Sequence, residues 1–175
     1  MFSLLVVLFF SVTGITLNHP EWSFGFKETK QEVSGVLPTG WKTAKGTDWL
    51  TVADYLRQKH HVHGTVADRR DEDTEGSVSF KAPGYAADCF FDERSGAYRI
   101  TILSQGPIGV LNDLHRGRDA GSAWSKLIDL SAIFLVLISL TGIGLIFYLK
   151  KMRVSGMVTF AVGCVIMLLL IRMAS

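Results

Sequence analysis

The chain has 175 residues, of which 48% are hydrophobic, and its 18 Lys and Arg nearly balance its 16 Asp and Glu. This balance, with no basic patch interleaved with aromatic residues, argues against nucleic acid as a partner. The apolar residues are gathered into long runs, which is typical of a small membrane protein with a soluble insert.

Three stretches of 17, 20 and 18 residues contain no charged side chain: 1–17, 130–149 and 154–171. A helix needs about 20 apolar residues to cross a bilayer core. We therefore predict a membrane α-helical protein with three spans, at 1–17, 127–149 and 154–173. The first stretch has no basic residue ahead of its apolar run and no small-x-small cleavage pattern, so we interpret it as an uncleaved anchor and not as a secretory signal.

The loop between the second and third predicted spans, residues 150–153, has the sequence KKMR and is strongly basic. Short basic loops stay in the cytoplasm. Residues 18–126 are therefore expected on the outer side of the membrane.

Within that outer segment, residues 18–110 are predicted to form one small α+β domain. The stretch 22–46 has scattered aromatic residues with Gly and Pro breaks, which predicts mostly loop with one short strand. The following sequence, TDWLTVADYLRQKHH, has apolar residues at helical spacing. Its helix is expected to be capped by Thr47 or Asp48 and to end before Gly64.

Beyond this helix the apolar period changes to two. The segments GTVADRR, GSVSFKA, YAADCFF and AYRITIL are short, rich in β-formers and separated by the turn signals DEDTEG, PG and DERSG. This pattern predicts an antiparallel sheet with the helix covering one face. A juxtamembrane segment, 111–126, then leads to the second span.

The common signatures of catalysis are missing from the sequence. It has no Gly-rich phosphate loop, no G-x-S-x-G elbow, no HExxH and no paired Cys motif. Cys89 alternates with Ala87 and Phe91, which favours a buried, inert thiol over an intermolecular disulfide. A subunit or accessory protein is therefore a better interpretation than a complete enzyme.

Three of the five histidines cluster in the sequence KHHVH, as His60, His61 and His63. In an extended chain, His61 and His63 share a face and can approach one metal ion, but two ligands do not complete a site. Imidazoles at a helix C-terminus, where the helix dipole favours positive charge, are the preferred interpretation.

The other two histidines flank predicted spans. His19 follows the first span, and His115 precedes the second within LNDLHRGRDAG. Both are expected at the outer membrane surface. Taken singly, each is best explained as an interfacial side chain satisfied by water, a lipid headgroup or backbone.

Small residues recur every four positions in the third predicted span, at Ser155, Thr159 and Gly163. Such a stripe allows the backbone of another helix to approach closely. It predicts an oligomer contact, with small residues facing lipid as the alternative.

Four motifs taken together resemble the PepSY-associated transmembrane helix proteins of bacterial inner membranes. They are SVTGITLNHPEW, FDERSGAYRIT, LNDLHRGRDAG and SLTGIGLIFYLKK. The resemblance covers roughly residues 1–25 and 85–151. It implies a location in the bacterial inner membrane, with residues 18–126 forming a periplasmic PepSY-like domain.

The resemblance also implies chemistry, because larger relatives carry b-type haem between paired histidines and some reduce ferric siderophores. On this chain it implies haem b near the periplasmic surface, with His19 and His115 as axial ligands and Arg116 and Arg118 toward the propionates. The implied partners are the lipid bilayer and other membrane or periplasmic redox proteins. A flavin attachment signature is absent, because Tyr98 stands where it needs Thr.

PepSY domains alone are known as non-catalytic partners of other proteins and as sensory modules. Two functions therefore follow from the resemblance. The chain is expected to be a haem-binding or accessory subunit of a ferric or flavin-linked reductase type of electron-transfer assembly. The alternative is an interaction or regulatory module without a cofactor.

Overall fold

The computed structural model describes residues 2–19, 22, 26–43, 46–72, 74–149 and 153–174, which form two compact units, Met1–Leu127 and Ile128–Ser175. Most of the predicted cytoplasmic loop, residues 150–152, lies outside the described residues. The elements in chain order are α1 Phe2–Asn18, β1 Thr29–Val36, β2 Lys42–Thr43, β3 Gly46–Thr47, α2 Trp49–His60, β4 Thr65–Asp71, β5 Glu75–Ala82, β6 Tyr85–Asp92, β7 Ala97–Ser104, α3 Gly106–Arg116, α4 Gly121–Tyr148 and α5 Arg153–Ala174.

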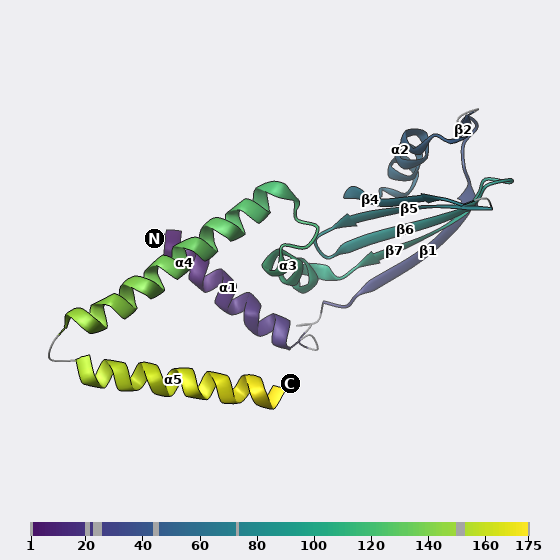
Figure 1. The fold of residues 1–175 in the computed structure, drawn as a ribbon. Coiled ribbons are helices and arrows are strands. Elements are labelled where there is room, and N and C mark those ends of the chain that lie inside the picture. Colours follow the sequence, from purple (N-terminus) through teal and green to yellow (C-terminus); the bar gives the residue numbers. More distant parts are fainter. Residues whose placement is uncertain are drawn as a thin grey trace. The chain divides into compact units, whose positions relative to one another are not determined.

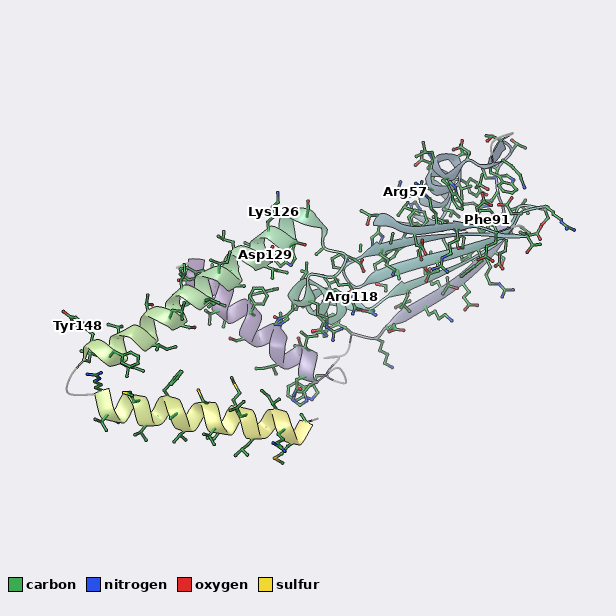
Figure 2. The ribbon with its side chains drawn as sticks, in the orientation of Figure 1. Arg57, Phe91, Arg118, Lys126, Asp129 and Tyr148 are labelled. Carbon is green, nitrogen blue, oxygen red and sulfur yellow. The ribbon has the colours of Figure 1, made fainter. Side chains whose placement is uncertain are left out.

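The first unit is built on a five-stranded antiparallel sheet of order β1-β7-β6-β5-β4, with α2 on one of its faces (Figure 1). We call β1 to β7 together with α2 the sheet domain. Its core lies between α2 and the sheet, and Figure 2 labels Phe91 within it. The predicted α+β domain with a helix over one sheet face is confirmed. The fully buried side chains of this core include Val52, Leu56, Phe80, Cys89, Phe91 and Ile100.

The helix α2 follows its local sequence signals closely. Asp48 is the N-cap, and its carboxylate accepts hydrogen bonds from the backbone amides of Leu50 and Thr51. Of the two caps considered, the chain therefore uses Asp48. The helix ends where His61 adopts a left-handed conformation with φ 53°, a conformation that short polar or imidazole residues adopt more easily than most.

The strand β1 is longer than the sequence predicted, since the prediction gave this region mostly loop with one short strand. It pairs with β7 over eight residues in unbroken register, from Thr29 opposite Ser104 to Val36 opposite Ala97. Nearly every residue of β1 is exposed. Since an exposed edge strand needs no alternation of apolar side chains, the sequence carried no periodic signal for it.

Two helices, α4 and α5, are long and apolar enough to cross a membrane. The N-terminal helix α1 is apolar but shorter, so the structure supports two of the three predicted spans. Helix α4 has 28 residues and begins at Gly121, earlier than the apolar run suggests. Its first turns carry Lys126 and Asp129, both labelled in Figure 2.

In the second unit, the three small residues of the α5 stripe have different surroundings. Ser155 and Thr159 line a shallow apolar cleft of about 480 Å³ together with residues of α4 such as Leu145. Around Gly163, no described atom lies within 4 Å of the position that a Cβ would take. An oligomer contact through this stripe stays a prediction.

Candidate functional site

Helix α3 begins directly after the last strand and is held at both ends by local signals. Pro107 occupies its first turn, where a missing N–H costs nothing. Gly117 ends it in a left-handed conformation, and its amide donates to Leu114 O at 3.2 Å. The amide of Arg118 donates to Asp113 O at 2.9 Å, which completes a Schellman-type C-cap.

The turn between β5 and β6 fixes α3 to the sheet domain. The amide of Gly84 donates to the buried carboxylate of Asp113 at 2.8 Å, and Gly84 O accepts from the amide of Gln105 at 2.8 Å. A Cβ on Gly84 would lie 2.7 Å from the backbone nitrogen of Val110. Glycine is needed here because the backbone of α3 approaches the turn so closely.

On its other side, α3 packs on α1 (Figure 1) through polar contacts. His115 Nδ1 lies 2.6 Å from Thr13 Oγ1, and the hydroxyl of Thr16 donates to Asn112 Oδ1 at 2.8 Å. Both threonines are buried. We call these four residues the α1–α3 seam. It joins an apolar helix to the sheet domain through α3.

The hydrogen bonds of Thr13 indicate the tautomer of His115. The Thr13 hydroxyl has an acceptor in its own helix, Phe9 O at 2.6 Å. A hydroxyl has one proton, so once it is donated to Phe9 O the oxygen can only accept from His115. His115 therefore carries a proton on Nδ1, and in the neutral imidazole the lone pair lies on Nε2. This is the arrangement found in metal-binding histidines, whose other nitrogen donates to a fixed acceptor.

The ring of His115 lies against an aromatic residue and a glycine of α1. Phe10 meets it edge to face, with ring centroids 5.1 Å apart. A Cβ added at Gly14 would lie 3.7 Å from Cε1 of His115, with no other described atom within 4 Å outside its chain neighbours and the nearby backbone of its own helix. Trp124 at the start of α4 donates to Leu114 O at 2.7 Å and stands edge-on to Phe9, which holds the end of α3 in place.

The other predicted site residues lie around this seam with partners of their own. His19 follows the end of α1 and stacks on Trp22, with ring centroids 4.1 Å apart. Arg116 is exposed in the last turn of α3. A guanidinium nitrogen of Arg118 lies 3.9 Å from the carboxylate of Asp113. The structure thus brings His115, Arg116 and Arg118 to one end of α3.

Two histidines of KHHVH, His60 and His63, contact tyrosines of the sheet domain. His60 Nε2 lies 2.6 Å from the hydroxyl of Tyr98, and burial lowers the pKa of this imidazole. His63 stacks on Tyr85. Within the described part of the chain, no three or more His, Cys, Asp or Glu side chains gather to hold a metal ion. Cys89 is buried, and burial raises the pKa of its thiol to about 12, which fits an inert thiol.

Sequence reasoning did not identify the seam partners of His115. Thr13 and Thr16 are three residues apart and therefore lie on one face of α1, inside an otherwise apolar run. A pair of hydroxyls at this spacing is a detectable sign that one face of a membrane helix contacts protein. Asn112 precedes His115 by three residues and lies on the corresponding face of α3.

Comparison with known proteins agrees with this architecture of a sheet domain tied to apolar helices. A family model described as PepSY_TM-like matches residues 1–174. No curated protein matches the chain, and neither does any solved structure. Because the match covers nearly the whole chain, this protein belongs to the PepSY_TM-like family of membrane proteins.

Proposed function

We propose that the protein is a haem-binding accessory subunit of a membrane electron-transfer assembly, with His115 as the principal ligand. The observation that carries this proposal is the 2.6 Å contact of His115 Nδ1 with the Thr13 hydroxyl, which leaves Nε2 of the neutral imidazole as the nitrogen that would bind iron. A haem bound there would supply one-electron transfer near the membrane surface. The residues of this chain would orient the ligand and shield the site.

The surroundings of His115 fit a flat, anionic cofactor on three counts. Gly14 leaves no side chain beside the imidazole edge. Phe10 offers an aromatic wall. Arg116, which has no ion pair among the described residues, is placed to meet a carboxylate.

The second proposed ligand, His19, must move to take part. In the structure its ring is stacked on Trp22, with ring centroids 4.1 Å apart. His19 stands beyond the end of α1, where helical hydrogen bonds no longer hold the chain. Bis-histidine ligation would therefore draw His19 away from Trp22 and toward His115.

Absorbance spectroscopy tests this proposal directly. Full-length protein, expressed with ample haem and purified in detergent, should show the Soret band of low-spin haem. His115→Ala and His19→Ala should each abolish that spectrum and leave the protein in the membrane. His63→Ala is the matched control, since His63 stacks on Tyr85 in the sheet domain, and it should keep the band. A wild-type protein without a Soret band would contradict the proposal.

A cofactor-free interaction module is the second candidate, and the α1–α3 seam favours it. Two side-chain hydrogen bonds at the seam and the contact of Asp113 with Gly84 form a continuous polar link from α1 to the sheet domain. Such a link suits a protein that passes a binding event between membrane and sheet domain. Under this function, the protein without haem would retain its partners, and His115→Ala would weaken their binding.

The proposed location is the bacterial inner membrane, with residues 18–126 in the periplasm. The basic sequence KKMR supports this orientation. A reporter that is active only in the cytoplasm should be active when fused after Met152 and inactive when fused within DEDTEG. Activity in the reverse pattern would invert the assignment of both compartments.

A further inference from the structure

A small pocket of about 140 Å³ lies where the sheet meets the end of α3, apart from the α1–α3 seam. Three of its strand residues, Lys81, Ala86 and Leu103, lie on the face of the sheet opposite α2, because each is next in sequence to a residue that belongs to the core or packs against it. Figure 2 labels Arg118 in this part of the molecule. The residues that shape it include Lys81, Ala86, Leu103, Asp113, Arg118 and Asp119.

The pocket is lined by two cationic and two anionic side chains, and only one cation and one anion among them form an ion pair. Asp113 is buried and bound by the amide of Gly84 and by Arg118. Lys81 Nζ and the carboxylate of Asp119 have neither a side-chain hydrogen bond nor an ion pair within the described residues. One cation and one anion are thus presented to the same small space without a partner.

The turn that carries Asp119 is held in place by its backbone. Asp119 has φ 54°, a left-handed conformation that costs a residue other than glycine free energy. The preceding C-cap of α3 fixes the turn, with the amides of Gly117 and Arg118 bonded back into the helix. The backbone therefore carries the Asp119 side chain at a defined place beside the pocket.

The chain next to the pocket carries the residues of a membrane boundary. Trp124, five residues after Asp119, is bonded to α3 through its indole N–H. Tryptophan is enriched at the level of lipid headgroups. The charge-free run of α4 begins at Leu130. The pocket thus belongs to the polar segment that adjoins this boundary.

We propose that this pocket binds the headgroup of a zwitterionic phospholipid with a primary ammonium group, as in phosphatidylethanolamine. The phosphate would be bound by Lys81 and Arg118, and the ammonium by Asp119. Ala86 and Leu103 provide an apolar floor for the two methylene groups between the charges. Phosphatidylglycerol lacks the cation for Asp119, and the trimethylammonium of phosphatidylcholine cannot donate a hydrogen bond to it. This inference does not depend on haem binding.

Native mass spectrometry of the full chain in detergent, with the three lipids added in equal amounts, tests this assignment. The wild type should retain phosphatidylethanolamine in preference to the other two lipids. Lys81→Gln and Asp119→Asn should each weaken that retention about fivefold, the effect of losing one partly exposed ion pair. Asn tolerates the left-handed conformation at position 119, so the second variant keeps the turn. Arg69→Gln, on the far edge strand β4, is the matched control and should have no effect.

Two further arms complete the experiment. Asp119→Lys makes the pocket net positive and should shift the preference to phosphatidylglycerol. Water-soluble glycerophosphoethanolamine should compete only weakly, because it lacks the acyl chains held by the membrane. Equal retention of all three lipids, or variants that behave as Arg69→Gln does, would overturn the proposal. Competition by the soluble compound as strong as by the lipid would overturn the assignment to a lipid.

Discussion

Phe80→Ala should lower the free energy of unfolding of the sheet domain by about 3–5 kcal/mol. The side chain of Phe80 is fully buried between α2 and the sheet. Its loss removes transfer free energy and leaves a cavity that the packed core cannot close. Because small domains are stable by only about 5–15 kcal/mol, a fall of this size should appear as a large drop in melting temperature by circular dichroism.

Phe90→Ala is the matched control for this prediction. Phe90 lies ten residues later in the chain, in β6, on the opposite face of the sheet. Its side chain is 51% exposed there. The same truncation there removes much less buried surface and should change the melting temperature only slightly. Equal losses in the two variants would mean that the core does not lie between α2 and the sheet.

Gly84→Ala should have the second large effect, and it should reach the candidate site. Gly84 has φ 65°, and an added Cβ would lie 2.7 Å from the backbone nitrogen of Val110. The strained backbone costs about 1–2 kcal/mol, and displacement of α3 adds about 1–3 kcal/mol. Hydrogen exchange should therefore show a loss of protection in α3, together with a lower melting temperature.

Gly40→Ala separates the two causes. Gly40 also has a positive φ, 94°, but apart from its two chain neighbours no described residue has an atom within 4 Å of its would-be Cβ. This variant should show the backbone strain alone and leave the protection of α3 unchanged. If α3 loses protection equally in both variants, the close approach of α3 to the β5–β6 turn is not what holds it.

Elements with a local signal could be predicted from the sequence. The cap at Asp48 and the apolar spacing defined α2, and alternation with turn residues defined β4 to β7. The turn from Asp92 to Gly96 was recognised by its residues, and its hydrogen bonds from Arg94 and Ser95 to Asp92 agree with that interpretation. Strand β1 was predicted only as one short strand in a loop, because its partner, β7, lies more than sixty residues away.

The candidate site was predicted only in part, for a related reason. His115 stood out because it precedes a long apolar run, but its contact with Thr13 joins residues 102 positions apart. The local sequence of an apolar helix does not specify which of its hydroxyl groups will form a hydrogen bond with a side chain from a distant part of the chain. The pairing of His19 with His115 rested on their expected place at the outer membrane surface and on the family resemblance, and in the structure His19 stacks on Trp22.

The adjacency of β1 and β7 determines how the sheet domain responds to force from the membrane. Thr29 and Ser104 face each other at one end of the ladder, so the segments leading to α1 and α3 leave the sheet side by side. Tension that separates these segments would open the ladder one pair at a time, because its hydrogen bonds lie along the pull. The α1–α3 seam bridges these two segments, so the strands bear load only after both of its hydrogen bonds, His115 to Thr13 and Thr16 to Asn112, have broken.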